Sequence, residues 1–160
     1  MKLLLKNLLF TVLVPGTVAV YLPLMIAGHR SPAPGIVWAI GCLLLTLGVA
    51  IYAWCVWDFA TYGRGTPAPI DAPKKLVIRG LYRYTRNPMY LGVLTIILGW
   101  AVHFRAAVLL AYALVVGTCF QLVIVLYDER HLQRAFGSEY EDYCARVGRW
   151  LPRFRRRAGV

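Results

Sequence analysis

The chain has 160 residues, of which 59% are hydrophobic, and its 18 Lys and Arg outweigh 7 Asp and Glu to give a formal net charge of +11. A water-soluble domain of this size does not need so many apolar residues for its core, so the composition excludes an ordinary soluble domain and indicates a membrane protein. The chain has no soluble domain that could contact the bases of a nucleic acid, so we expect no nucleic-acid partner.

Four long apolar stretches follow one another, and we expect each to form a transmembrane helix. They cover residues 3–27, 35–57, 88–103 and 106–127. The second is the clearest, because about 20 apolar residues span a hydrocarbon core of about 30 Å. The third is short, so we expect it to begin in the interface or to thin the bilayer. The predicted fold class is all-α: a multi-pass membrane protein with about four transmembrane helices and cytoplasmic amphipathic C-terminal helices.

The basic residues predict the orientation of this bundle. Two Lys stand at its start, six Lys or Arg lie between the second and third stretches and eight Arg follow the fourth, whereas each outer hairpin has one Arg. Positive charge collects on the cytoplasmic side, so we expect both termini and the central loop there, most simply in a bacterial inner membrane. The basic run 153–157 is interpreted as an anchor to anionic lipid. The proline-rich segment within 58–79 is expected to form a stiff cytoplasmic strap.

The 4 cysteines and 3 histidines show no metal-ligand spacing. We therefore predict no metal site and interpret the cysteines as small hydrophobic residues.

The first distinctive motif is "GLYRYTRNPMYLG" at 80–92. Asn87 followed by Pro88 is a strong helix-start signal, with Asn as the N-cap residue and Pro at the first helical position. Gly92, in the first turns, lets another backbone or a ligand approach closely. Arginines next to a helix N-terminus suit an anionic group, so Arg83 and Arg86 predict a binding site here.

The second motif follows the fourth apolar stretch. Asp128 and Glu129 are adjacent carboxylates directly after a membrane span, an expensive place for negative charge unless cationic groups meet it. Arg130, Arg134 and the arginines of the central loop are the candidate partners. Gly137 is expected to end one helix, with Ser138 capping the next and Glu141 completing a capping box. An apolar stripe at spacings of three and four predicts helices that lie on the membrane surface and turn this stripe inward. The stripe consists of Leu132, Phe136, Tyr140, Tyr143 and Val147.

Together the two motifs closely resemble the isoprenylcysteine carboxyl methyltransferases and their relatives, the phospholipid N-methyltransferases. Their shared pattern is Arg-His-Pro-x-Tyr-x-Gly, then a Glu-Glu pair, Phe-Gly-x-x-Tyr and a final Arg-x-x-Pro, and the resemblance covers about residues 58–153. Two positions depart from it, since Asn87 stands in place of His and Asp128 in place of the first Glu. The matching residues are Arg86, Asn87, Pro88, Tyr90, Gly92, Asp128, Glu129, Phe136, Gly137, Tyr140, Arg149 and Pro152.

The resemblance implies a membrane enzyme that transfers a methyl group from S-adenosylmethionine, which would bind in a cytoplasmic pocket of the half 58–160, while 1–57 supplies two transmembrane helices. It implies catalytic roles for Glu129 and Arg149, with Arg149 suited to an anionic acceptor. Trp150 and the tyrosines would flank the adenine. The residues expected to bind the cofactor are Tyr82, Arg86, Asn87, Pro88, Tyr90, Gly92, Asp128, Glu129 and Tyr140.

The methyl acceptor is expected to be amphiphilic, a prenylcysteine-like carboxylate or a lipid, and to enter by a lateral opening beside the stretch 106–127. An amine acceptor would need deprotonation, for which Glu129, Asp128 and His131 are available.

Two alternatives stay open. Membrane sterol reductases resemble this family in their C-terminal halves and use NADPH, whose 2′-phosphate Arg79 and Arg83 would suit. The other alternative is a non-catalytic membrane protein that retains the pocket. The oligomeric state is not predicted, because Gly41 and Gly48 suit close helix packing either within or between chains.

Overall fold

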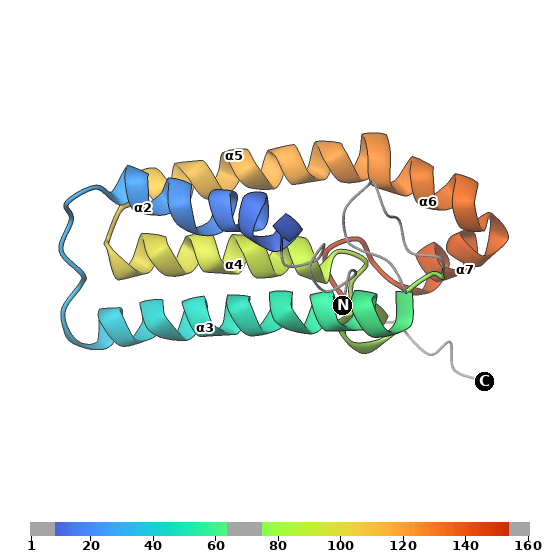
Figure 1. The fold of residues 1–160 in the computed structure, drawn as a ribbon, viewed down its shortest axis with the longest axis horizontal. Coiled ribbons are helices and arrows are strands. Elements are labelled where there is room, and N and C mark those ends of the chain that lie inside the picture. The colour runs from blue at the N-terminus through green and yellow to red at the C-terminus, as the bar shows by residue number, and fades with distance from the viewer. Residues whose placement is uncertain (1–8, 64–74, 154–160) are drawn as a thin grey trace.

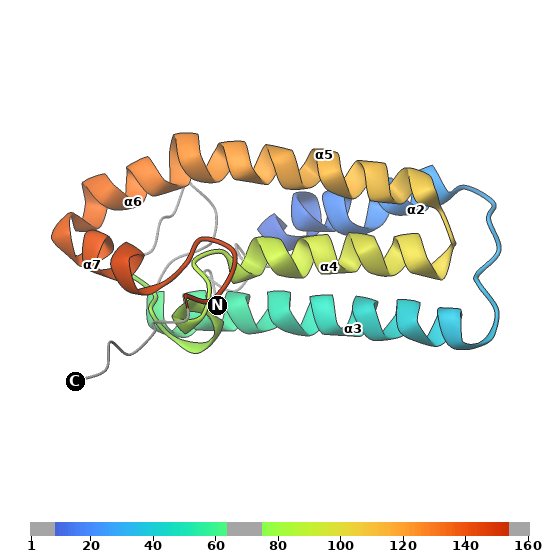
Figure 2. The same ribbon diagram turned by 180° about the vertical axis from the view of Figure 1, so that it is seen from behind.

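The computed structural model describes residues 9–63 and 75–153, which form a bundle of long, roughly parallel helical rods (Figures 1 and 2). Three rods are long and apolar enough to cross a membrane, and α4 is a shorter apolar helix, so the chain is a multi-pass membrane protein as expected. Residues 3–8, 64–74 and most of the basic run 153–157 lie outside the described residues, so most of the strap predicted within 58–79 is not described. Its start at 58–63 is helical and continues the second rod, which differs from the prediction. The long rods are Leu9–Ala27, Gly35–Gly63 and Ala107–Phe136.

The first rod contains a π-helical turn, η1 (Thr17–Tyr21), followed by α2 (Leu22–Ala27). Two side chains from other helices donate hydrogen bonds to carbonyl groups of this π-helical turn. Trp100 Nε1 donates to the Ala19 carbonyl at 3.0 Å, and Tyr112 Oη donates to the Val18 carbonyl at 2.9 Å. Near its start, the Thr11 hydroxyl lies 3.1 Å from that of Tyr52. These bonds hold the N-terminal rod against the rest of the bundle.

The second rod is α3 (Gly35–Asp58) continued by a π-helical turn, η2 (Phe59–Gly63), and it packs closely on α4 (Pro88–His103). The contact depends on small residues: a Cβ atom at Gly48 would lie 2.6 Å from Ile96 Cγ1 and 2.8 Å from the Gly92 carbonyl oxygen. A Cβ atom at Gly41 would likewise lie 2.9 Å from both the Cα and the Cβ atom of His103. Both α3 glycines therefore serve packing within the chain.

The boundaries of α4 agree with the prediction, since Asn87 is its N-cap residue and Pro88 its first residue. The Asn87 side chain, however, makes no capping bond to this helix.

The third rod differs from the prediction at its C-terminal end. Helix α5 (Ala107–Val123) runs through a π-helical turn, η5 (Ile124–Asp128), into α6 (Glu129–Phe136), so α6 is not a separate surface helix (Figure 1). The reason is local: no Gly or Pro occurs between Gly117 and Gly137, so nothing ends the helix where charge begins.

At Gly137, with a φ of 52°, the chain turns back into α7 (Ser138–Arg146). The capping-box prediction is wrong in detail, because Gly137 is the N-cap residue and no side chain caps α7. Glu141 instead accepts a hydrogen bond of 2.6 Å from Gln133 Nε2. The predicted apolar stripe does pack inward, where its members from α6 and α7 form one cluster with Leu76 and Ile78.

The two ends of the bundle are chemically different. The turns between the first and second rods and between α4 and α5 lie at one end (Figures 1 and 2). Helices α6 and α7 and a short 3₁₀ helix, η4 (Gly80–Arg83), lie at the other. Both distinctive sequence motifs therefore meet at the same end.

Candidate functional site

Two loops far apart in the sequence pair side by side at this end. Thr85 and Gly148 form an isolated parallel bridge, and the Arg86 amide donates to the Gly148 carbonyl at 2.9 Å. The Arg149 carbonyl accepts from the Thr85 hydroxyl at 3.0 Å and from Asn87 Nδ2 at 3.1 Å. Asn87 therefore connects the start of α4 to the loop that carries Arg149.

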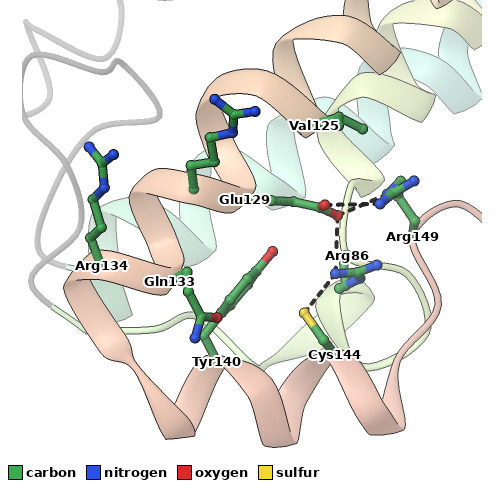
Figure 3. Close-up of a pocket in the computed structure, with 9 residues that line it drawn as sticks. Arg86, Val125, Glu129, Gln133, Arg134, Tyr140, Cys144 and Arg149 are labelled. Carbon is green, nitrogen blue, oxygen red and sulfur yellow. Dashed lines mark hydrogen bonds and ion pairs between the residues drawn. The ribbon is translucent and has the colours of Figure 1, made fainter.

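This pairing places Glu129 between two guanidinium groups (Figure 3). Arg149 donates to both carboxylate oxygens, from Nε at 2.8 Å and from Nη2 at 2.9 Å. Arg86 Nη1 lies 3.1 Å from Oε1 of the same carboxylate. The hydrogen bond to Glu129 raises the pKa of Arg149, so this guanidinium keeps its charge. We call these three residues the Glu129 triad.

Arg86 has a further neighbour that the sequence did not indicate. Its Nη1 donates to the Cys144 thiol at 2.7 Å, although Cys144 was interpreted as a plain hydrophobic residue. The signal that marks it is its spacing, because Cys144 follows Tyr140 by one helical turn and shares its face of α7. Arg86 Nε is buried and has no hydrogen-bond partner in the described part of the chain.

A polar cavity of about 550 Å³ opens on the Glu129 triad. Gln133 and Arg134 line it from α6, and Tyr140 and Cys144 from α7 (Figure 3). Arg130 of α6 also lines it. Its volume lies within the range of about 300–1,000 Å³ that is usual for small-molecule sites. Its lining residues include four arginines and one carboxylate, so the cavity favours a ligand with an anionic group.

A second cavity, of about 530 Å³, lies deeper among the helices and is mainly apolar. It is lined by the first rod, α3, α4, α5 and α7, so it draws on both halves of the chain. Its few polar groups include Asp128, Tyr90, Asn87 and His131. Tyr90 Oη donates to Asp128 Oδ2 at 2.8 Å, which partners this carboxylate within apolar surroundings.

The adjacent carboxylates thus serve different cavities. Asp128 lines the apolar cavity and Glu129 the polar one, because consecutive side chains on a helix point about 100° apart. Arg86 lines both cavities and stands at the wall between them.

The predicted site residues fall into four groups. Tyr82, Asn87, Tyr90 and Asp128 line the apolar cavity, Tyr140, Glu129 and Arg149 line the polar cavity, and Arg86 lines both. Pro88 and Gly92 line neither, because Pro88 is buried at the start of α4 and Gly92 packs against α3. Trp150, expected beside the adenine, also lines neither and donates to Gln121 Oε1 at 2.8 Å.

Buried tyrosines connect the elements at the end of the bundle that holds the polar cavity, which we call the polar end. Tyr143 Oη donates to the Tyr82 carbonyl at 2.7 Å and so ties α7 to η4. Burial raises the pKa of Tyr82, Tyr140 and Tyr143, so all three stay neutral and keep a hydroxyl proton to donate.

Fold and site together define a multi-pass membrane protein that holds a polar, ligand-sized cavity beside an apolar one at one end of its bundle. A family model described as phospholipid methyltransferase matches residues 36–139, and the chain belongs to this methyltransferase family.

Several curated proteins are similar to part of this chain. Methanethiol S-methyltransferase of Pseudomonas deceptionensis is 35% identical over 91 residues, which are 57% of this chain and 33% of the relative. A probable protein-S-isoprenylcysteine O-methyltransferase of Oryza sativa subsp. indica is 37% identical over 83 residues, 49% of this chain and 41% of the relative. Methanethiol S-methyltransferase of Mycobacterium tuberculosis is 36% identical over 72 residues, 45% of this chain and 28% of the relative.

The chain therefore spans less than half the length of these relatives. No solved structure gives a significant match.

Proposed function

We propose that the protein transfers a methyl group from S-adenosylmethionine to an amphiphilic acceptor that reaches the site from the membrane. The observation that carries this proposal is the pair of cavities that share Arg86, one polar and one apolar, in a chain of the phospholipid methyltransferase family. A polar methyl donor and an apolar methyl acceptor can therefore bind in separate, adjacent cavities, with Arg86 lining both.

The residues of the polar cavity fit the donor. S-Adenosylmethionine presents a carboxylate and an ammonium, and the guanidinium of Arg86 suits the first while Glu129 suits the second. Tyr140 offers an aromatic surface for the adenine. When bound, the cofactor supplies a methyl group on an activated sulfonium. The protein's contribution is then mainly alignment and exclusion of water.

The apolar cavity supports an acceptor with a hydrocarbon part. The named relatives act on methanethiol and on isoprenylcysteine, and the family description names phospholipids. A cavity of about 530 Å³ is far larger than methanethiol needs, so we favour a lipid-like molecule with a small polar group. Asp128 lines this cavity and accepts a hydrogen bond from Tyr90, so it can accept a hydrogen bond or a proton from the polar group of the acceptor.

The reductase alternative receives less support. Arg79 and Arg83, which would bind the 2′-phosphate of NADPH, are exposed and line neither of the two cavities. Arg79 instead lies over the ring of Tyr62, with 5.2 Å between its guanidinium carbon and the ring centroid.

A transfer assay tests the proposal. Purified protein in nanodiscs is incubated with S-adenosylmethionine that carries a tritiated methyl group, together with a panel of long-chain amines, thiols and carboxylates. We expect label to pass into the organic extract with at least one acceptor. A protein that binds the donor but labels none of these acceptors, nor the native lipids, would contradict the proposed activity and favour a non-catalytic role.

We further propose that the cavity end of the bundle faces the cytoplasm of a bacterial cell, with both chain termini on that side. The described basic residues support this orientation, because the opposite end carries Arg30 and Arg105 while the cavity end carries most of the others. Single cysteines at Ser31 and Ser138, both exposed, test it with a membrane-impermeant maleimide on intact cells. We expect Ser31→Cys to be labelled and Ser138→Cys to be protected until the cells are opened; the reverse pattern would invert the orientation.

A further inference from the structure

Cys144 lies at the centre of the polar end, on the face of α7 that looks toward Arg86 and Glu129 (Figure 3). Its thiol accepts a hydrogen bond of 2.7 Å from Arg86 Nη1, the same nitrogen that lies 3.1 Å from Glu129 Oε1. Among the described residues, these are the contacts that hold the guanidinium of Arg86, one from α7 and one from α6.

The orientation of Arg86 matters because of where it stands. Its side chain is only 12% exposed and lines both cavities. Its buried Nε lacks a partner within residues 9–63 and 75–153, and a buried donor without a partner costs free energy until a ligand or water satisfies it. A planar guanidinium fixed at Nη1 has its Nε direction fixed too.

We propose that Cys144 is a positioning residue: its thiol holds the guanidinium of Arg86 at the wall between the cavities, so that this group keeps one orientation toward the carboxylate of the methyl donor. The ligand named here rests on the proposed function, whereas the hold of Cys144 on Arg86 does not. Arg86 touches the ligand in this scheme, and Cys144 acts through it.

The competing explanation is packing, because Cys144 also lies against the cluster of Tyr140, Tyr143 and Val147. Two substitutions separate the explanations. Cys144→Ser keeps a hydrogen-bond acceptor on a smaller side chain, whereas Cys144→Val removes the acceptor on a larger, apolar side chain that leaves no cavity. Cys119→Val is the matched control, since Cys119 is exposed on α5 and lines neither cavity.

Calorimetric titration with S-adenosylhomocysteine in nanodiscs gives the first test. We expect Cys144→Ser and Cys119→Val to bind within about twofold of the unmodified protein, and Cys144→Val to bind about tenfold more weakly, the effect of losing a hydrogen bond to a charged group. Normal binding by Cys144→Val together with weak binding by Cys144→Ser would overturn the proposal in favour of packing.

A thermal double-mutant cycle without ligand gives the second test. We expect Cys144→Val to lower the unfolding midpoint by about 3 °C when Arg86 is present, and to change it little in the Arg86→Gln background. Equal shifts in both backgrounds would mean that the two residues are not coupled and would overturn the proposal. If the unmodified protein binds no adenosyl ligand, the proposed function fails, while this cycle still decides whether Cys144 holds Arg86.

Discussion

Glu129 concentrates the chemistry of the polar cavity at a single side chain. Its carboxylate accepts two hydrogen bonds from Arg149 and forms an ion pair with Arg86. One partly buried negative charge therefore balances part of the positive charge of two arginines. The sequence predicted that Arg130, Arg134 or the arginines of the central loop would meet the acidic pair. For Glu129 this holds in part, because Arg86, 43 positions away, belongs to that loop, whereas Arg149, 20 positions away, was not among the candidates. Asp128 accepts a hydrogen bond from the Tyr90 hydroxyl instead. Such partners depend on tertiary structure, and local spacing cannot identify them.

Arg149→Lys tests the geometry of this arrangement at constant charge. An ammonium cannot reproduce the paired bonds that a guanidinium makes to both carboxylate oxygens, so Glu129 should lose its fixed orientation. We expect the dissociation constant for S-adenosylhomocysteine to rise about tenfold in calorimetry. Arg146→Lys, an exposed position on α7, should bind within about twofold of the unmodified protein; equal affinity in both variants would argue against the triad.

The contact between α3 and α4 sets the framework on which the site stands. Its glycines were recognisable in the sequence, and the start of α4 at Asn87 and Pro88 was predicted because helix-start signals are local. The continuation of α5 into α6 was not predicted, since the first charges at 128–129 were read as the end of the rod. Helical structure continues there because it depends on backbone propensity rather than on hydropathy.

Gly48→Ala tests the close approach of α3 to α4. A new Cβ would lie 2.8 Å from the Gly92 carbonyl, so the helices must move apart at a cost of about 2 kcal/mol. We expect a lower thermal unfolding midpoint in nanodiscs. Gly117→Ala on α5 is the matched control, because its Cβ would meet only Leu94 at 3.8 Å, and it should be neutral or stabilising. A midpoint for Gly48→Ala as high as that of the control would contradict the packing described.

At the scale of the whole molecule, the fold joins a polar cavity at its end to an apolar cavity among its spans. The apolar cavity is bounded on one side by Val14 and Pro15 of the first rod and by Phe120 and Val123 of α5. Val14 is 50% exposed although it lines this cavity, so no other described element covers the wall here. The lateral opening predicted beside α5 is accordingly proposed between α5 and the first rod.

Val14→Trp tests this route. A bulky ring at the wall of the apolar cavity should hinder a long-chain acceptor, so we expect methyl transfer to fall about tenfold or more while the affinity for S-adenosylhomocysteine stays within about twofold. Leu13→Trp provides the control, because Leu13 is 60% exposed and does not line the cavity. Equal transfer rates in the two variants would place the acceptor's route elsewhere.

The most direct test of the account is calorimetric titration of the protein in lipid nanodiscs with S-adenosylhomocysteine and with NADPH. It is performed on the unmodified protein, on Glu129→Gln and on Glu139→Gln, whose exposed carboxylate on α7 serves as control. We predict that S-adenosylhomocysteine binds the unmodified protein and the control, that Glu129→Gln still unfolds cooperatively but binds it more than about tenfold more weakly, and that NADPH gives no heat. Undiminished binding by Glu129→Gln, or heat with NADPH alone, would contradict the assignment of the polar cavity to the methyl donor.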